Sequence, residues 1–310
     1  MTAPAMAGPH SDLEGFVPMR RLLAVLAAVA AVLGLSTTSV HAVTGNFVPD
    51  FEHEYVGLIV FYGADGAPVH RCSGSLLTDT VFLTAGHCVT LDDEGTLATS
   101  ARIYFEQDAG AEYDPELGYD PDTGYPLTGG ITASTLYSYG YEGLRNLPQS
   151  RDVGLVILDE PVTNVYPNVD TYASLAAAET LDTYGRGIDA TVDISGYGVT
   201  NPHPNFPESY RSRLMTTTFI IGGRNPLLTN DYNVQLAANP GGGRGGTCFG
   251  DSGGPVLLSD TDVIVAVTSY GLNGNCAGQA YGYRTDQQDV INWILAHAGD
   301  EASEINIVTI

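Results

Sequence analysis

Short apolar runs separated by turn-forming residues dominate the chain from about position 55 onward. The first run, residues 56–62, is apolar or aromatic and is followed by the turn-forming segment 63–67. Further apolar runs occupy residues 81–83, 103–105, 153–158, 255–258 and 263–267. Runs of this length bounded by Gly, Pro and Asp are typical of β-strands. The pattern therefore predicts an all-β barrel or sandwich.

One segment near the C-terminus has a helical pattern instead. Val290, Trp293 and Ile294 recur at helical spacing within residues 289–297, which predicts a single amphipathic helix. His297, at its end, fits a surface position better than a ligand position. The remaining tail, residues 299–310, is short and acidic, and the sequence leaves open whether it packs on the body or is disordered.

The N-terminal region has the features of an export signal. Two arginines follow Met19, an apolar run of 14 residues covers 22–35, and Val40 and Ala42 are small residues of the kind that a signal peptidase reads. The run is short for a membrane span. We predict a secretory signal peptide at 19–42, preceded at 1–18 by an extension from a mis-assigned start. The alternative is an uncleaved membrane anchor.

Composition and charge narrow the classes of function. The chain has 310 residues, of which 44% are apolar and 15% charged, so it can bury a sizeable core. Its 36 acidic residues against 12 basic ones, all arginine, give a net charge of −24. Because such a surface repels phosphates, we expect neither nucleic acid nor anionic membranes as partners. After signal cleavage we expect a secreted protein with no membrane attachment, and a monomer is the default.

A glycine-rich stretch carries the first candidate for chemistry. Ser252 lies in the sequence GDSGG at 250–254, directly before the apolar run 255–258. Glycines permit positive φ angles, which allow several backbone N–H groups to point at one spot, as an oxyanion hole requires. The stretch fits both the nucleophile elbow of α/β-hydrolases and the serine loop of chymotrypsin-like peptidases.

The order of the partners separates these two alternatives. An α/β-hydrolase requires an acid and then a histidine after the serine, whereas here TAGHC places His87 at 84–88 and DVGLVIL places Asp152 at 152–158, both before Ser252. With these three motifs in this order, the chain resembles the chymotrypsin-like (trypsin-fold) serine peptidases of bacterial type over residues 43–298. The resemblance implies two packed six-stranded antiparallel β-barrels with a short C-terminal helix and the active site between the barrels.

The resemblance also implies roles for these residues. His87 is the general base, Asp152 orients its ring, Ser252 is the nucleophile, and the N–H groups of Gly250 and Ser252 form the oxyanion hole. The implied activity is hydrolysis of polypeptides through an acyl-enzyme, without a metal or other cofactor. Two alternatives remain: a catalytically silent binding protein of the same fold, and a serine esterase.

Four cysteines in an exported chain indicate two disulfides, for which three pairings are open. The resemblance selects Cys72–Cys88, beside His87, and Cys248–Cys276, beside the Ser252 loop. Each bridge would then clamp one half of the active site.

The resemblance further suggests the substrate pocket and a role for the mature N-terminus. Gly246 would lie at the pocket base, with Gly271 and Ala280 as its walls, which predicts an uncharged pocket for an apolar or aromatic side chain. An arginine-specific pocket is the alternative. Signal cleavage would expose Val43, whose ammonium would pair with Asp251; otherwise other donors must satisfy that carboxylate.

An acidic segment at 106–122 contains seven carboxylates and no basic residue. Oxygen ligands clustered in a loop suit calcium, but the regular ligand spacing of an EF-hand is missing. We therefore predict a solvated acidic loop, with calcium binding as the alternative.

Overall fold

The computed structural model describes residues 43–109, 129–200, 212–222, 227–239 and 241–310. These residues belong to one unit, Val40–Ile310. The predicted signal peptide, the extension before it and most of the acidic segment 106–122 lie outside the described residues.

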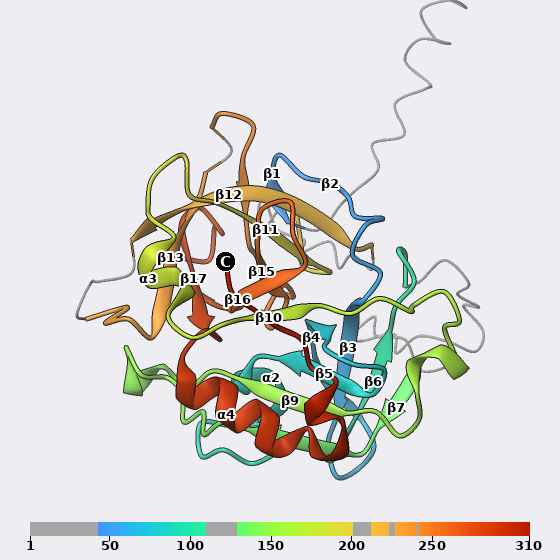
Figure 1. Cartoon of the computed structure of the whole chain (residues 1–310). Helices are drawn as coiled ribbons and strands as arrows, with labels where there is room; N and C mark the ends of the chain where they lie inside the picture. The colour runs from blue at the N-terminus through green and yellow to red at the C-terminus, as the bar shows by residue number, and fades with distance from the viewer. Residues whose placement is uncertain (1–42, 110–128, 201–211, 223–226, 240) are drawn as a thin grey trace, which may run out of the picture. The chain divides into compact units, whose positions relative to one another are not determined.

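The first sheet is an antiparallel path of seven strands, in the order β7-β6-β3-β4-β5-β9-β8. It occupies the lower half of Figure 1. Its strands are β3 (Val56–Tyr62), β4 (Pro68–Leu76), β5 (Val81–Thr84), β6 (Ser100–Tyr104), β7 (Ile131–Ala133), β8 (Thr135–Ser138) and β9 (Gly154–Ile157).

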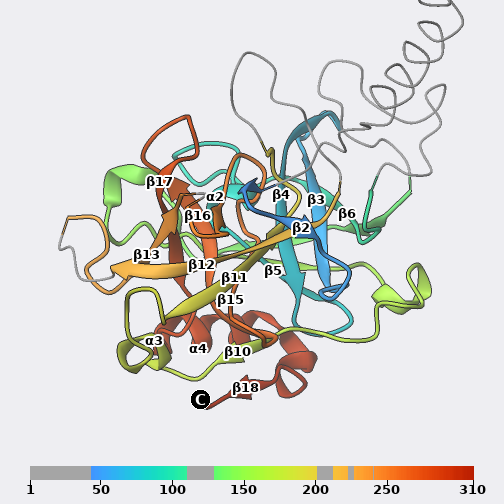
Figure 2. The same ribbon diagram turned by 90° about the horizontal axis from the view of Figure 1, so that it is seen from above.

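The second sheet contains a closed ring of six antiparallel strands in the order β15-β11-β12-β13-β17-β16, because β15 also pairs with β16. This ring lies in the upper half of Figure 1, and Figure 2 shows it from above, with β3, β4 and β6 of the first sheet beside it. Its strands are β11 (Thr191–Gly196), β12 (Leu214–Gly222), β13 (Asn233–Ala238), β15 (Pro255–Leu258), β16 (Val263–Gly271) and β17 (Gly278–Arg284).

Three short strands extend this ring. β2 (Val48–Pro49) pairs with β12, while β10 (Ser174–Ala176) runs parallel to both β16 and β18 (Ile307–Val308). The predicted all-β fold of two barrels is confirmed, and the strands predicted at 56–62 and 255–258 have the expected bounds. The first sheet differs in having seven strands, and the parallel pairs were not predicted.

Helices are few and short in the described part of the chain. They are α2 (Gly86–Val89), α3 (Thr180–Thr183), α4 (Gln288–His297) and the 3-10 turns η1 (Leu144–Asn146), η2 (Val162–Asn164) and η3 (Gly299–Ser303). α4 matches the predicted amphipathic helix and buries Val290, Ile291 and Ile294. In none of these helices is an apolar stretch long enough to cross a membrane.

The tail after α4 packs on the body. The N–H of Leu175 donates to the carbonyl of Asn306 at 2.9 Å, which joins β18 to the second sheet through β10. The Glu301 carboxylate accepts hydrogen bonds from Thr78 and Thr80 beside the first sheet. The tail therefore contacts both sheets, which resolves the alternative that the sequence left open.

Candidate active site

His87 and Asp152 meet where α2 follows β5 and the chain enters β9. The His87 Nδ1 atom lies 3.1 and 2.9 Å from the two Asp152 carboxylate oxygens, and the His87 backbone N–H donates to the same carboxylate at 2.7 Å. Asp152 has no exposed surface, whereas 26% of the His87 side chain is exposed. The carboxylate thus fixes one edge of the ring and leaves the rest of it near the surface.

Asp152 has a second side-chain partner that the sequence did not reveal. The Ser269 hydroxyl, from β16, donates to Asp152 Oδ2. Burial raises the pKa of Asp152, but the nearby His87 and the hydrogen bonds from His87 and Ser269 outweigh it and lower that pKa. For His87, burial lowers the pKa, while the charge and hydrogen bond of Asp152 raise it above its ordinary value. The pair therefore favours an ionised carboxylate beside an imidazole that takes up a proton readily.

The Ser252 loop contains two backbone N–H groups without an acceptor among the described residues. Gly250 and Gly253 have φ angles of +98° and +78°, which favour glycine at both positions. The N–H groups of Gly250 and Ser252 make no hydrogen bond within the described residues, although the Ser252 carbonyl accepts from the N–H of Ser73 at 2.8 Å. The N–H of Gly253 in turn donates to the Thr268 carbonyl at 2.8 Å. The loop is therefore held by its other backbone groups, while the two N–H groups assigned to the oxyanion hole remain available to a ligand.

A cavity of about 90 Å³ opens beside Ser252. Gly271 and Ala280, the predicted walls, both line it, and Tyr270 in the wall stacks on Tyr281 with 4.6 Å between ring centroids. No charged residue lines it within the described chain; the lining is Thr247, Cys248, Phe249, Ser252, Thr268, Tyr270, Gly271, Asn273, Cys276, Gln279 and Ala280.

Gly246, predicted at the base of the pocket, is not among these lining residues. It is buried in β14 (Gly245–Gly246), which pairs with β1 (Thr44–Gly45). A Cβ atom at Gly246 would lie 2.5 Å from the Ala238 Cβ, which is closer than real atoms approach. The local packing therefore opposes any side chain at this position.

Both disulfides join the pairs selected at the sequence level. Cys72–Cys88 and Cys248–Cys276 have Cα–Cα distances of 6.2 and 5.1 Å. Three possible metal-ligand atoms, the two sulfurs of Cys72 and Cys88 and a ring nitrogen of His87, lie within 4.8 Å of one another. Because both sulfurs are in the disulfide, they offer no thiolate for a metal.

Asp251, next to Ser252, is fully buried. Its carboxylate accepts hydrogen bonds from the N–H groups of Gly198 and Cys248, each at 2.8 Å. Burial nevertheless raises its pKa to about 7, against the lowering effect of those bonds and of the Arg71 charge. Val43 is also buried, and Thr44 after it donates through its hydroxyl to the Gly246 carbonyl at 3.3 Å. The start of the predicted mature chain thus lies against the strand that leads into the serine loop.

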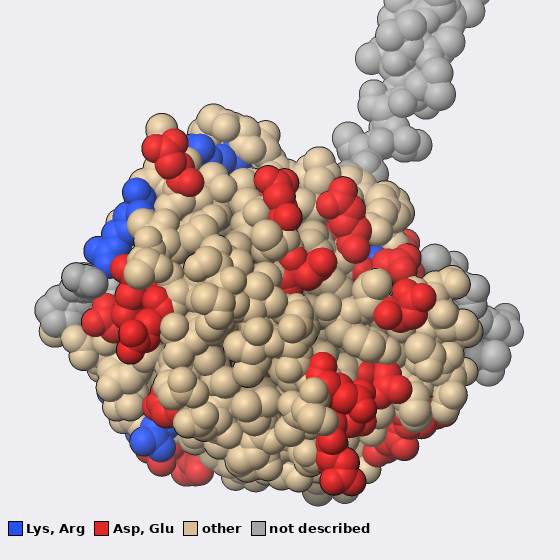
Figure 3. Space-filling model, in the orientation of Figure 1, with Lys and Arg blue, Asp and Glu red and all other residues tan. Residues whose placement is uncertain are grey.

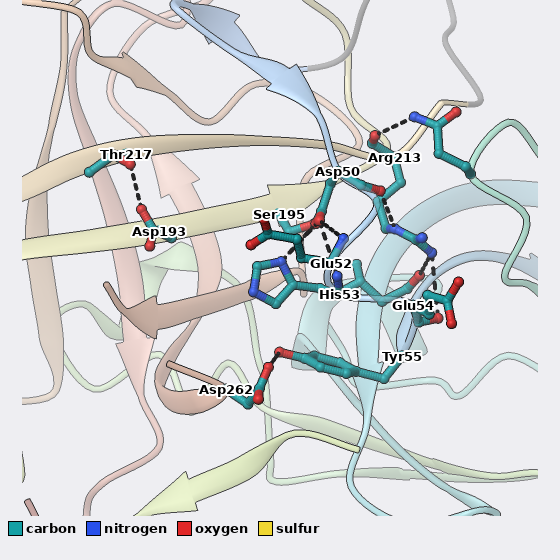
Figure 4. Close-up of polar contacts among 12 residues, drawn as sticks. Asp50, Glu52, His53, Glu54, Tyr55, Asp193, Ser195, Arg213, Thr217 and Asp262 are labelled. Atoms are coloured by element: carbon teal, nitrogen blue, oxygen red, sulfur yellow. Dashed lines mark hydrogen bonds and ion pairs between the residues drawn. The ribbon is translucent and has the colours of Figure 1, made fainter. Parts of the chain in front are cut away.

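A second group of Asp, His and Ser lies elsewhere in the molecule (Figure 4). His53 Nδ1 is 3.0 Å from both oxygens of Asp50, and the Ser195 hydroxyl donates to Asp50. Ser195 has no exposed surface and bonds to the carboxylate rather than to the histidine. A serine so placed has no histidine to take its proton and no access to substrate, so this group does not have the geometry of a catalytic triad.

The family model described as Trypsin matches residues 48–294. Trypsin-1 from Astacus astacus is 26% identical, over 75% of this chain and 90% of its own. A venom plasminogen activator from Gloydius brevicauda is 24% identical, over 78% of this chain and 82% of its own.

Solved structures share the fold. A collagenase structure superposes with a TM-score of 0.57 at 20% identity, covering 84% of this chain and 98% of its own. The protease Anisep from Arthrobacter nicotinovorans gives a TM-score of 0.53 at 19% identity, covering 81% and 99%. Human heparin binding protein gives 0.56 at 17% identity, covering 83% and 98%. With the family model matching most of its length, the chain belongs to the trypsin family of serine endopeptidases.

Proposed function

We propose that the chain is a secreted endopeptidase that cuts polypeptides through an acyl-enzyme formed on Ser252, with His87 as base and Asp152 as its orienting partner. The observation that carries this proposal is the buried Asp152 carboxylate bound to His87 Nδ1 at 2.9 Å, in a segment on which the Ser252 loop packs so closely that a Cβ at Gly253 would lie 2.7 Å from the Ala85 nitrogen. Because that contact places the proton on Nδ1, Nε2 is the nitrogen that takes the serine proton. The His87 imidazolium then protonates the departing amine.

The oxyanion of the tetrahedral intermediate would be held by the N–H groups of Gly250 and Ser252, which have no hydrogen-bond acceptor among the described residues. In well-studied enzymes, removing one such donor costs about 3 to 4 kcal/mol of transition-state stabilisation. The residues so assigned complete the reaction by themselves, and we keep the prediction that no metal or organic cofactor takes part.

The preferred residue before the cut bond is apolar or aromatic. An uncharged cavity with a Tyr270 wall supports this preference. An aspartate at position 246, which would select arginine or lysine, is opposed by the Ala238 contact. Profiling with p-nitroanilide peptides that end in Phe, Leu or Arg tests this, and a preference for Arg would contradict it.

Export through the segment 19–42 would free Val43. The buried Asp251 carboxyl, whose pKa is raised to about 7, would gain a cationic partner from the new ammonium, and deprotonation would then cost less. Comparing activity before and after removal of residues 1–42 tests this step. Equal activity in the uncleaved chain would show that the donors already around Asp251 suffice.

The test of the nucleophile is labelling with a fluorophosphonate probe, followed by mapping of the labelled residue. We expect one label at Ser252, lost in Ser252→Ala and retained in Ser195→Ala. A folded protein that takes no label would favour the alternative of a silent binding protein, and peptide ester cleavage without amide cleavage would favour an esterase.

A further inference from the structure

The cavity beside Ser252 is uncharged in a strongly acidic molecule. Acidic residues outnumber basic ones across the face shown in Figure 3, whereas no carboxylate is among the described residues that line the cavity. The polar side chains of the lining are uncharged: Thr247, Ser252, Thr268, Tyr270, Asn273 and Gln279. Hydrogen bonds, rather than charge, are therefore the means by which this cavity selects a side chain.

Three of these polar side chains are already engaged. The Tyr270 hydroxyl donates to the Leu228 carbonyl at 2.8 Å. The Gln279 side-chain oxygen accepts from the Tyr281 hydroxyl at 2.9 Å. The Asn273 amide bonds to two backbone groups of its own loop. With Ser252 as the proposed nucleophile, the two threonines of the lining are the remaining polar side chains.

Thr268 has a buried hydroxyl without a partner. The residue is 5% exposed, and none of the described residues makes a hydrogen bond to its Oγ1 atom. Its backbone is fixed, because its N–H donates to the Gly254 carbonyl at 2.9 Å and its carbonyl accepts from the Gly253 N–H at 2.8 Å. Since the hydroxyl and the methyl group share Cβ, rotation about χ1 alone turns either of them toward the cavity. The serine loop therefore holds this hydroxyl in place beside Ser252.

Thr247 supplies a second hydroxyl to the same lining. The residue is 9% exposed, and its side chain makes no hydrogen bond within the described part of the chain. On one side of it Gly246 pairs with β1, and on the other the Cys248 N–H donates to the Asp251 carboxylate at 2.8 Å. A buried hydroxyl without a partner is unfavourable, and a ligand group that bonds to it removes that cost.

We propose that the cavity selects tyrosine over phenylalanine as the residue before the cut bond, through hydrogen bonds between the phenol hydroxyl and the hydroxyls of Thr247 and Thr268. This inference rests on the proposed function and narrows its apolar or aromatic preference to one side chain. Of Phe, Tyr and Trp, only Tyr has a group that both donates and accepts, as a threonine hydroxyl does. A site that bonds to a substrate hydroxyl also rejects the analogue without it, because its own polar groups are then left unpaired.

The substrate test compares three peptide p-nitroanilides that differ only in their last residue, which is Tyr, Phe or 4-fluorophenylalanine. We expect kcat/KM for the tyrosine peptide to exceed that for the phenylalanine peptide by about tenfold or more. Fluorine occupies the place of the hydroxyl but donates no hydrogen bond, so the fluorinated peptide should behave like the phenylalanine peptide. Because these measurements use the parent protein, they decide the proposal even where a variant fails to fold.

Variants assign the preference to the two hydroxyls. Thr268→Val and Thr247→Val each remove a hydroxyl at nearly constant side-chain volume, so each should lower the ratio of kcat/KM between the tyrosine and phenylalanine peptides. Thr268→Ser should retain that ratio. Thr285→Val is the matched control, because the Thr285 hydroxyl is also buried without a partner among the described residues but does not line the cavity. It should leave the ratio unchanged.

The outcomes separate this inference from the proposed function. Equal kcat/KM for the tyrosine and phenylalanine peptides would overturn the inference and leave the proposed function in place, since both peptides are then cleaved. A fluorinated peptide that matches the tyrosine peptide, or a ratio that neither Thr268→Val nor Thr247→Val lowers, would do the same. A protein that cleaves none of the three peptides would overturn the inference, and a missing fluorophosphonate label at Ser252 would then overturn the proposed function as well.

Discussion

Two regions of this molecule pair a buried aspartate with a histidine in nearly the same geometry. His87 Nδ1 lies 2.9 Å from Asp152, and His53 Nδ1 lies 3.0 Å from Asp50. In both pairs the carboxylate has no exposed surface, its pKa is lowered, and the pKa of the histidine is raised.

The two regions differ in where the serine lies and in what the free side of the ring faces. Ser195 donates to Asp50 as Ser269 donates to Asp152, so these two serines occupy equivalent positions in the two pairs. Ser252, the proposed nucleophile, has no counterpart beside His53. The His87 side chain is 26% exposed and that of His53 9%. An Asp–His pair therefore does not mark a peptidase site by itself; a serine in an accessible loop is also required.

The largest difference between the two regions is expected in kcat, when each aspartate is replaced by asparagine. Asp152→Asn should lower kcat by about 10⁴-fold, as in a well-studied enzyme with this arrangement, because the ring loses its tautomer and its charge partner. Asp50→Asn should leave kcat within a few-fold. Peptide hydrolysis at saturating substrate measures both, and equal losses would show that the two pairs act together.

A large effect on stability is expected at both aspartates. Asp50→Ala leaves the N–H groups of Glu52 and His53, the His53 ring and the Ser195 hydroxyl without their acceptor. Removing one partner of a buried pair typically costs about 3 to 5 kcal/mol of unfolding free energy. Urea unfolding measures this loss, and Asp152→Ala is the matched control, because it should lose a similar amount together with its activity.

Smaller effects are expected at the two serines that bond to these carboxylates. Ser195→Ala and Ser269→Ala each remove one hydrogen bond to a charged acceptor, worth about 1.5 to 3 kcal/mol of stability. Only Ser269→Ala should also lower kcat, since it alone touches the His87 partner. Unfolding and kinetics on the same preparations separate the two effects, and a change in kcat with Ser195→Ala would contradict the assignment.

The smallest expected effect is a shift in the pH dependence of kcat/KM. His87 must be neutral to act as base, and its pKa is raised above 6.5, so kcat/KM should fall as the pH falls through this raised value. Removing the Asp152 charge lowers the His87 pKa, so the residual activity of Asp152→Asn should persist to lower pH. The kcat/KM profile of Asp50→Asn should match that of the parent, and a shifted profile there would show coupling between the regions.

Much of the fold followed from local patterns. The runs at 56–62 and 255–258 are short, apolar and bounded by turn residues, and they form β3 and β15 with those bounds. The helical spacing of Val290, Trp293 and Ile294 likewise predicted α4. The parallel pairs of β10 with β16 and β18 were beyond such reasoning, because pairing between distant segments leaves no local pattern.

The candidate site, like the fold, was only partly predictable from the sequence. His87, Asp152 and Ser252 were predicted because each sits in its own motif; the structure brings His87 and Asp152 together, and the catalytic roles of the three stay a prediction. The disulfide pairs followed from the resemblance that those motifs carry. Ser269 and the Asp50 group were missed, since Ser195 is 145 residues from Asp50 and Ser269 is 117 from Asp152. No spacing or composition in the chain signals such pairs.

The sequence by itself determined the strand pattern, the glycine loop and the identity of the three motif residues, because each depends on neighbours along the chain. The tertiary structure alone decided that Asp50 meets His53, that Gly246 has no room for a side chain, and that His53 lines an acidic groove. Those outcomes depend on burial and on contacts between distant strands, and both exist only once the two sheets have formed and packed.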